Sequence, residues 1–433
     1  MFGDRVPNRE ERLSPGSHAR IASAIATTLG ALWILAVLGV NEWTIAWFVG
    51  VPSLFPGSRI VVGLFDLFAL SWGVVSVIWS SRAWVLNLNL SVLTSLALLG
   101  LFEASLHVYP QMLGHTFANG VFSKYNTSAT GIYYRDYALK MNFMVPNFKT
   151  QMYYYGYTWE HQTDEFGFRT VPGRVRTDVA ILGDSFVYGH GMQFSNTVAA
   201  RLEQYTGMTV SNLGRQGDSA WQEAFLLTEH IDRVRPRYVV YVYFQNDIRD
   251  LYDYLTDDEL NGFLAAPVTE LRFPKRGELS VLLTERSRRN NDEEKSRSLS
   301  ELLRRRVLLS RVPDLVGFAK KEQALDSRIA KSGNDLNDEH SLGWRVEKHF
   351  VRYMHWLSRE HNAAFLIVPI VPDAPRHFEI LRRLAADEGI PFVDTSSMAR
   401  SKEELWLPRD MHLSEAGAKL LAQLIGDSLF QKP

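Results

Sequence analysis

The chain has 433 residues, which is too long for one small domain, so at least two structural units are expected. Its 47 lysines and arginines balance 48 aspartates and glutamates, and this charge balance argues against nucleic acid as a partner. Cysteine is absent, which excludes disulfide bonds and thiolate metal sites. Apolar residues crowd the first quarter and most of the charge follows it, as in a membrane segment joined to a soluble domain.

The first quarter of the chain predicts a membrane anchor. Residues 1–20 form a short basic tail, and three apolar runs follow it, at 21–40, 60–80 and 84–108. Each run is long enough to cross a hydrocarbon core. A cleaved signal peptide is the alternative for the first run, but its apolar region would be shorter and would end in a small-residue cleavage site. We therefore expect about three retained transmembrane helices.

The basic residues predict the orientation of these helices. The tail and Arg82 would lie on one side of the membrane, and the loop at 41–59, whose one basic residue is Arg59, on the other. By the positive-inside rule the amino terminus is cytoplasmic, and three spans place everything after residue 108 outside. The expected location is therefore a bacterial inner membrane, with the later residues periplasmic or extracellular.

Three ionisable residues fall inside the predicted spans, namely Asp66, Glu103 and His107. We expect them at similar depth near the outer ends of their helices, with Glu103 and His107 on one helix face because they are four residues apart. They could form a polar access route for an acyl donor or a lipid-linked substrate. The alternative is that they reach the outer headgroups and have no chemical role.

Residues 109–178 form a polar juxtamembrane region that is rich in aromatic residues, tyrosine above all. Exposed rings beside a cleft would offer surfaces on which sugars stack. Alternating buried rings would instead belong to strands packed on the soluble core. Both interpretations stay open.

Residues 179–433 alternate between strand and helix patterns. Five short apolar runs predict strands, at 179–182, 208–212, 238–244, 364–369 and 391–394. Helical patterns lie between them, so the expected fold class is α/β with a five-stranded parallel sheet covered on both faces. Residues 253–340 interrupt the alternation, and their length marks a charged insertion. Its charge runs favour solvated helix faces over a lid or a membrane-surface patch.

The first predicted strand ends in Gly183-Asp184-Ser185, which places a serine hydroxyl at the carboxyl end of a parallel strand, where ligands bind. Asp410 and His412 stand just before the last helical pattern and can reach the same sheet edge. The carboxylate would steady the imidazole, which would take the serine proton as general base and return it as general acid. A lone histidine is more often a surface residue, so the pattern counts only as a set.

Donors for an oxyanion are expected at the ends of the second and third strands. Gly214 and Gly217 follow the second strand, where a glycine lets a backbone N–H approach a ligand closely. Asn246 follows the third, where its amide could point into the same crevice. Glycines also make ordinary turns and Asn-Asp commonly caps a loop, and the sequence does not choose between the two glycines.

These four blocks, in this order, resemble those of the SGNH or GDSL hydrolase superfamily over roughly residues 165–250 and 345–430. The resemblance implies a three-layer α/β/α, flavodoxin-like domain that needs no metal or cofactor. It also implies roles for the residues: Ser185 as nucleophile, His412 as base and Asp410 as its orienting acid. The Ser185 N–H, the Gly217 N–H and the Asn246 amide would form the oxyanion hole.

Two further features refine the resemblance. The superfamily's last block is usually Asp-x-x-His, but here Asp410 stands two residues before His412 and Arg409 occupies the usual place of the acid. Asp-x-His is similar to the version in bacterial exopolysaccharide O-acetyltransferases and their relatives, which puts simple hydrolysis in doubt. Upstream, residues 164–169, Asp-Glu-Phe-Gly-Phe-Arg, look like the Gly-Phe-Arg stretch of membrane-anchored members.

The sequence thus predicts a membrane-anchored, extracytoplasmic serine esterase that acts on O-acyl, above all O-acetyl, esters of a cell-surface or exported glycan. With a sugar hydroxyl as acceptor, the same acyl-Ser185 would make it an O-acetyltransferase, which should need a membrane partner to deliver the acyl group. Three spans are few for importing an acyl group, and this favours the esterase. A non-catalytic glycan-binding component of an export assembly is also compatible with the sequence, as is an enzyme that acts on a lipid ester.

Overall fold

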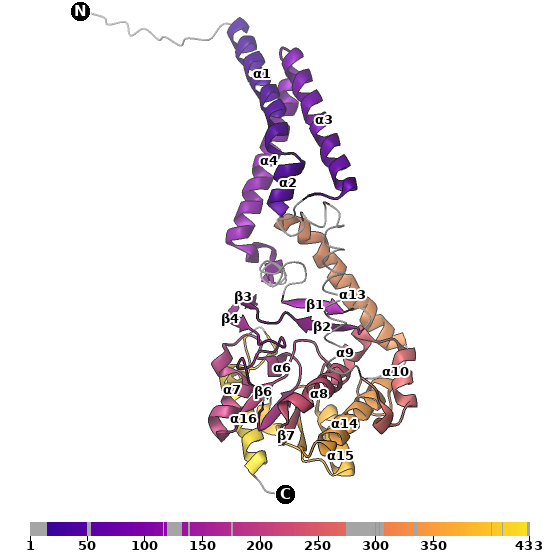
Figure 1. Cartoon of the computed structure of the whole chain (residues 1–433). Helices are drawn as coiled ribbons and strands as arrows, with labels where there is room; N and C mark the ends of the chain where they lie inside the picture. The colour runs from indigo at the N-terminus through magenta and orange to yellow at the C-terminus, as the bar shows by residue number, and fades with distance from the viewer. Residues whose placement is uncertain are drawn as a thin grey trace, which may run out of the picture. The chain divides into compact units, whose positions relative to one another are not determined.

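The structure is a computed structural model that describes residues 15–49, 53–115, 117–118, 132–136, 139–174, 176–273, 299, 303, 307–331, 336–399, 401–408 and 410–430. Most of the predicted basic tail, Arg409 and a large part of the predicted insertion lie outside these residues. The chain divides into two compact units (Figure 1). One consists of residues 1–112 and 288–312, and the other of residues 113–287 and 313–433.

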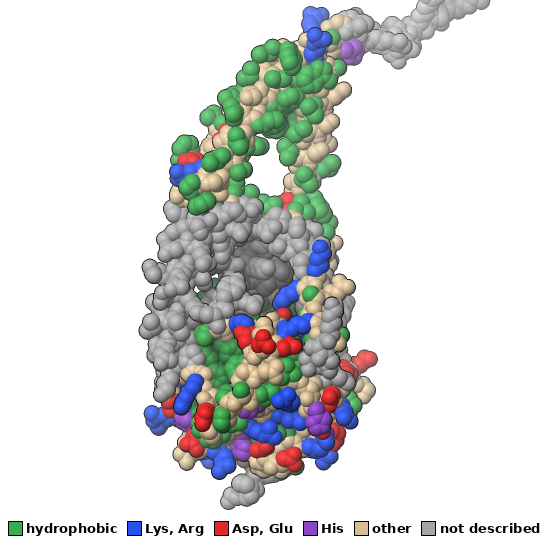
Figure 2. Space-filling view, turned by 90° about the vertical axis from the view of Figure 1, so that its right-hand side faces the viewer, with side chains coloured by type: hydrophobic (Ala, Val, Ile, Leu, Met, Phe, Trp, Pro, Cys, Tyr) green, Lys and Arg blue, Asp and Glu red, His purple; other side chains and the backbone are tan. Residues whose placement is uncertain are grey.

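The first unit contains three long apolar helices, as the sequence predicts. They are α1 (Pro15–Gly39), α3 (Pro56–Ile78) and α4 (Ala83–Val108), and the short α2 (Glu42–Val49) separates the first two. Each of the three is long and apolar enough to cross a membrane. Hydrophobic side chains such as those of Leu38, Leu67 and Leu101 are exposed on them, and Figure 2 shows such side chains over the visible face of this unit. The surface suits contact with lipid.

Helices α1 and α3 approach each other closely where two glycines meet. A Cβ atom on Gly30 would lie 2.8 Å from the carbonyl oxygen of Gly73, and one on Gly73 equally close to the carbonyl oxygen of Gly30. Farther along the same contact, the hydroxyls of Ser23 and Ser80 are 3.0 Å apart. Small residues of this kind allow close backbone packing, which holds helices together in lipid.

A single asparagine links the three helices. The Asn89 oxygen accepts hydrogen bonds from the indole N–H groups of Trp33 (2.9 Å) and Trp72 (3.2 Å). Its amide nitrogen donates to the Ser76 hydroxyl (3.0 Å) and to the Val85 carbonyl (2.9 Å). Asn89 is fully buried and uses both of its polar atoms. It is therefore a polar hub in a mainly apolar helix bundle.

Glu103 has a structural role that the sequence pattern does not suggest. Its carboxylate lies 3.1 Å from His107 Nε2, which confirms that the two residues share a helix face. The same carboxylate accepts the backbone N–H groups of Leu308 (2.6 Å) and Leu309 (2.9 Å), where η4 (Leu308–Arg311) begins. Glu103 thus fastens a part of the insertion to α4.

The second unit is built on a parallel sheet of four strands, β5 (Val179–Leu182), β6 (Val210–Asn212), β7 (Tyr238–Phe244) and β8 (Ala364–Ile370). Their order in the sheet is β6-β5-β7-β8, and every neighbouring pair is parallel. The predicted α/β class with a parallel sheet is confirmed. The described parts of the predicted insertion are mostly helical, with the end of α9 (Asp247–Tyr254), α10 (Asp257–Ala265) and α13 (Val312–Lys331).

The prediction of a fifth full strand at 391–394 is wrong. This segment makes a single parallel bridge, between Phe392 and Ile367 of β8. Pro391 has no N–H to donate, and the Asp394 carboxylate turns back to accept the N–H of Ser396 (2.8 Å). Pairing therefore stops after one bridge. With this segment beside β8, the order still follows the flavodoxin-like pattern 2-1-3-4-5.

Side chains along the strands alternate between two apolar clusters. In β7, Val240 and Val242 enter the cluster that contains α7 (Val198–Thr206) and α16 (Glu415–Phe430). Tyr241 and Tyr243 enter the opposite cluster, with α8 (Ala220–Val234), α14 (Leu342–Glu360) and α15 (Pro375–Glu388). Figure 1 shows the two groups of helices on opposite sides of the strands. The unit is thus the three-layer α/β/α arrangement expected from the sequence.

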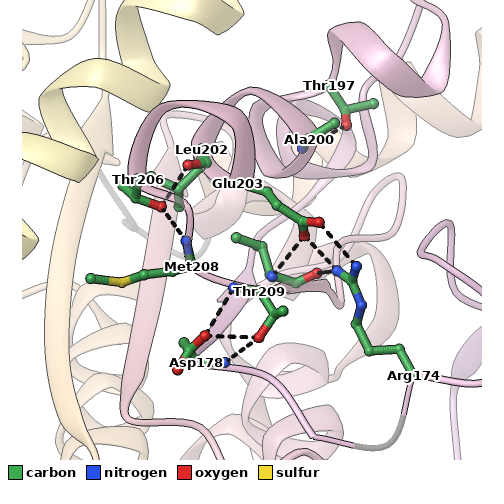
Figure 3. A network of polar contacts seen from close by, with 10 residues as sticks. Arg174, Asp178, Thr197, Ala200, Leu202, Glu203, Thr206, Met208 and Thr209 are labelled. Carbon is green, nitrogen blue, oxygen red and sulfur yellow. Dashed lines mark hydrogen bonds and ion pairs between the residues drawn. The ribbon is translucent and has the colours of Figure 1, made fainter.

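A polar network closes the amino edge of the sheet (Figure 3). Arg174 pairs with Glu203 of α7 and donates to the carbonyl of Val210 (3.0 Å). The Asp178 carboxylate accepts both the N–H and the hydroxyl of Thr209, each at 2.9 Å. These bonds tie the starts of β5 and β6 to α7. These contacts at the amino edge are structural. The candidate site, described below, lies at the carboxyl edge of the sheet.

The juxtamembrane region folds into two antiparallel hairpins. One pairs β1 (Tyr133–Asp136) with β2 (Met141–Met144), and the other pairs β3 (Lys149–Tyr154) with β4 (Tyr157–Gln162). Tyr153 and Trp159 are buried, as the core interpretation of these rings expects. Tyr155 and Tyr157 are half-buried, so the hairpin also presents aromatic surface.

The Asn89 hub generates a stability prediction. In Asn89→Leu, the indole N–H groups of Trp33 and Trp72 lose their acceptor inside an apolar bundle. An interhelical hydrogen bond in a membrane is worth about 0.6 to 1.7 kcal/mol, so we expect a loss of roughly 1 to 3 kcal/mol. Unfolding of the detergent-solubilised protein by sodium dodecyl sulfate, followed by tryptophan fluorescence, measures it. Asn87→Leu, at an exposed position of α4, is the control. Equal effects of the two changes would contradict the hub.

Candidate active site

Ser185 stands where β5 turns into the short helix α6 (Ser185–Tyr188). The turn requires a glycine before it, because a Cβ on Gly183 would lie 2.4 Å from Val187 Cγ2. The Asp184 carboxylate accepts the N–H of Phe186 (2.9 Å) and so caps the helix. Ser185 is half-buried between buried neighbours, and its N–H belongs to the first turn, where no intrahelical acceptor exists. The hydroxyl is therefore both rigidly placed and accessible.

The structure brings Ser185, His412 and Asp410 together. His412 Nε2 is 2.7 Å from Ser185 Oγ, and His412 Nδ1 is 2.7 Å from Asp410 Oδ1. The loop that carries the last two residues is held by a bridge between Trp406 and Leu413, just before α16. The two contacts are those that the predicted roles of nucleophile, base and orienting acid require, and the roles themselves stay a prediction.

The charge state of Asp410 suits this arrangement. Burial alone would raise the pKa of its carboxyl, but the hydrogen bond and the favourable electrostatic interaction with His412 outweigh burial, so the pKa lies below its ordinary value. An ionised Asp410 holds the proton of His412 on Nδ1, which leaves the Nε2 lone pair to accept the serine proton. It would also stabilise the imidazolium that this transfer creates.

Gly214 and Gly217, the two candidates for a backbone donor to the oxyanion, have different surroundings. Gly214 is buried, its N–H donates to the Asn212 side chain (3.0 Å), and a Cβ there would lie 2.6 Å from Val187 Cβ. Gly217 is half-exposed with φ +74°, and a Cβ there would find its nearest neighbour, the Tyr254 hydroxyl, at 3.9 Å. Gly214 thus serves close packing against α6, and Gly217 is the better candidate for a ligand-facing N–H.

Asn246 is turned toward a protein partner in this structure. It stands at the start of α9, and its amide nitrogen donates to Asp250 Oδ2 (2.8 Å) one turn later. The chain therefore holds the amide at the carboxyl end of β7, the place expected for it. To stabilise an oxyanion, the amide would have to exchange Asp250 for the substrate oxygen.

A second Gly-Asp-Ser tripeptide, at 217–219, has a different environment from the first. Ser219 is fully buried, it directly precedes α8, and its N–H donates to the Gln222 side chain (2.9 Å). Asp218 pairs with the buried Arg215 (2.7 Å). This tripeptide therefore starts a helix, and its serine is not available to a substrate.

The Gly-Phe-Arg stretch forms a clamp beside the site. Gly167 allows a tight turn, and Arg169 after it is almost fully buried. The Arg169 guanidinium donates to the carbonyls of Gly189 (2.7 Å) and Met192 (2.7 Å), and also to that of Glu160 (2.9 Å) in β4. It therefore ties the loop after α6 to the β3–β4 hairpin.

Sequence reasoning missed one residue of the site, His190, in the loop held by this clamp. Its ring stacks on His412, with ring centroids 4.1 Å apart and planes 20° from parallel. Together with Asp410 they offer ligand atoms within 4.8 Å of one another. Both nitrogens of His412, however, already contact Ser185 and Asp410. A metal ion bound to His412 would therefore displace one of these two contacts of the catalytic triad proposed below, Ser185, His412 and Asp410. The Tyr-Gly-His-Gly segment after Ser185 was the available signal, and spacing alone does not assign it a role.

Several buried carboxyl groups interact with one another, and one of them, Asp184, adjoins Ser185. Burial raises the pKa of each, to about 6 for Asp184 and Asp218 and to about 7 for Glu347, and well above the ordinary range for Glu223 and Asp247. The Tyr241 hydroxyl donates to Glu347, and Arg215 partly offsets the rise at Asp218. The fold thus holds part of this group in the protonated form.

No protein-family model matches the chain, and no curated protein matches it. Solved structures similar to it include a lipase/acylhydrolase from Enterococcus faecalis, with 13% identity over 58% of this chain and 94% of that chain and a TM-score of 0.31. A GDSL-like lipase from Bacteroides thetaiotaomicron VPI-5482 has 12% identity over 60% of this chain and 90% of that chain, with a TM-score of 0.32. A catalytic mutant of an acetylxylan esterase from Geobacillus stearothermophilus has 12% identity over 61% of this chain and 97% of that chain, with a TM-score of 0.32. Similarity at these TM-scores decides neither fold nor activity, which rest on this chain's own geometry.

The buried carboxyl of Glu347 predicts a pH-dependent stability. Its pKa of about 7 in the folded chain exceeds its ordinary value of 4.5, so the folded state retains a proton that the unfolded state loses between these values. Stability should therefore fall as pH rises from about 4.5 to about 7. Glu347→Gln removes this loss, and the variant should gain stability relative to wild type at pH 8 compared with pH 5.

Thermal unfolding of the detergent-solubilised protein at the two pH values measures this difference. Glu360→Gln, at an exposed position of the same helix, should unfold like wild type at both. If the stability difference between Glu347→Gln and wild type is the same at pH 5 and pH 8, the raised pKa is refuted.

Proposed function

We propose that the chain is a membrane-anchored serine esterase of the SGNH type. The observation that carries the proposal is the pair of 2.7 Å contacts that join Ser185 to His412 and His412 to Asp410. The flavodoxin-like strand order and the position of Ser185 after β5 support it. A purely glycan-binding module would not need an accessible serine hydroxyl, an imidazole and an ionised carboxylate in line.

The chemistry follows from these contacts. Ser185 Oγ attacks the ester carbonyl carbon while His412 Nε2 takes its proton, and the negative charge moves to the carbonyl oxygen. The Ser185 and Gly217 N–H groups and the Asn246 amide would stabilise this oxyanion. The tetrahedral intermediate collapses, the leaving alkoxide takes the proton from His412, and acyl-Ser185 remains. Water then attacks the acyl group with His412 as base, which releases the acid and restores the serine.

The proposed substrate is an O-acyl ester, above all an O-acetyl ester, on a cell-surface or exported glycan. The three apolar helices support anchoring in a membrane, and the positive-inside rule puts the second unit on the outer face. Half-buried Tyr155 and Tyr157 on the hairpin beside the site could stack against sugar rings. The bilayer and an acylated glycan are the proposed partners.

Transfer to a sugar hydroxyl would use the same acyl-enzyme, so the acceptor must be measured. The purified full-length protein is incubated with an acetylated polysaccharide in ¹⁸O-labelled water. Release of labelled acetate indicates an esterase, whereas acetyl transfer to an added glycan that lacks acetyl groups indicates a transferase. A transferase would also call for a membrane protein that supplies the acyl donor.

The triad predicts strongly non-additive losses. Hydrolysis of p-nitrophenyl acetate by Ser185→Ala or by His412→Ala should fall by roughly a thousandfold or more, and the double variant should lose little further. The matched controls Ser195→Ala and His340→Ala change exposed residues outside the site and should keep the wild-type rate. If wild type and all variants hydrolyse p-nitrophenyl acetate at the same background rate, an acyl-serine mechanism for this ester is refuted.

The oxyanion role of Asn246 is tested separately. Loss of one oxyanion donor costs about 100- to 1,000-fold in kcat, so Asn246→Ala should lose activity in that range with little change in KM. Asn261→Ala, at an exposed position of α10, is the control. If Asn246→Ala keeps its kcat, the contact with Asp250 is structural only and the amide is not an oxyanion donor.

A further inference from the structure

His190 is a buried imidazole that the proposed mechanism does not use, although it lies against two members of the triad. Its ring stacks on His412 at 4.1 Å, and its Nε2 lies 3.8 Å from Asp410 Oδ2. Asp410 presents its other oxygen, Oδ1, to His412. The carboxylate is therefore flanked by one imidazole on each oxygen.

In the amide orientation of this structure, a chain of hydrogen bonds sets the tautomer of His190. The Tyr133 hydroxyl donates to the Gln216 side-chain oxygen (2.6 Å), so the amide nitrogen of Gln216 faces the other way and donates to His190 Nδ1. A ring nitrogen that accepts a hydrogen bond carries no proton. His190 therefore carries its single proton on Nε2, on the side of Asp410. The tautomer follows from the orientation of the amide.

The surroundings keep His190 neutral and in place. Burial, and then the neighbouring His412, lower its pKa well below the ordinary value. Tyr154 contacts the ring edge-on at 4.4 Å, and Trp159 packs at 4.8 Å. Arg169 holds the backbone on both sides of the residue through the carbonyls of Gly189 and Met192. The proposed base, His412, becomes positively charged when it takes the serine proton. A neutral His190 ring stacked on it does not oppose this charge, whereas a cationic ring would repel it.

We propose that His190 is a positioning residue of this site. Its neutral ring holds the His412 imidazole in the plane that reaches Ser185, and its Nε2–H directs a positive dipole at Asp410 Oδ2, which leaves Oδ1 aimed at His412. The Tyr133–Gln216 chain keeps the tautomer that this role needs. The inference rests on the proposed function, in which Ser185 is the nucleophile.

Two variants test the role. His190→Phe keeps a stacked ring but removes the N–H that faces Asp410. Gln216→Glu keeps the shape of the side chain but replaces the amide donor with a carboxyl group. Once ionised, this group can only accept a hydrogen bond, so His190 Nδ1 must then acquire a proton. Either the Nε2 proton is then lost or the ring becomes charged beside His412. Both variants should slow the attack of Ser185 by about tenfold or more, without weakening the initial binding of a reagent.

The reagent is a fluorophosphonate probe, whose phosphorus Ser185 Oγ attacks with loss of fluoride. Inactivation of the full-length protein in detergent micelles gives a maximal rate, kinact, and the probe concentration at half of that rate. We expect kinact to fall in both variants while this concentration and the melting temperature stay near wild type. Gln193→Glu makes the same charge change at an exposed position of the loop that carries His190 and should react like wild type.

The outcomes separate this inference from the one on which it rests. If the wild-type protein is not labelled at Ser185, the proposed function fails. If the wild type is labelled and both variants react at its rate, His190 has no positioning role. Should His190→Phe melt early, Gln216→Glu decides, and a kinact no lower than that of Gln193→Glu overturns the inference.

Discussion

The candidate site depends on the parallel alignment of the strands. Ser185 and His412 are 227 positions apart, yet their side chains lie 2.7 Å from each other. Because parallel strands end at one edge of the sheet, the loop after β5 and the loop before α16 meet there. The polar contacts of Arg174 and Asp178 occupy the opposite edge. Chemistry at one edge and structural bonding at the other follow from the same topology.

This topology explains what could be predicted from the sequence. Long apolar runs identify the three long helices, and short apolar runs identify strands, from the local sequence alone. Ser185, Asp410 and His412 were accessible to prediction because each adjoins such an element. The fifth strand failed because the apolar pattern at 391–394 does not register that Pro391 lacks a donor and that Asp394 turns back on Ser396. Pairing depends on both strands, and a pattern describes only one.

The residues that escaped prediction have roles set by distant partners. Asn89 acts as a hub only because α1 and α3 bring Trp33 and Trp72 to it. His190 matters only because Gln216 and Asp410 lie on either side of its ring. The two Gly-Asp-Ser tripeptides have identical residues, and they differ in burial and in partners: Ser185 meets His412, whereas Ser219 is buried and bonds to Gln222. In each case the informative quantity is a long-range contact, which no local window contains.

The Asn89 hub also orders the assembly of the bundle in time. The asparagine is on the last of the three helices to be synthesised, whereas its indole donors are on the first two. Before α4 emerges, the indoles of Trp33 and Trp72 have no Asn89 to bind, and an isolated α4 carries an amide that hydrocarbon solvates poorly. The polar groups are satisfied together only when the third helix joins the other two. The hub therefore favours the complete bundle over any two of its helices, and the loss of one helix would leave polar side chains of the other two without these partners.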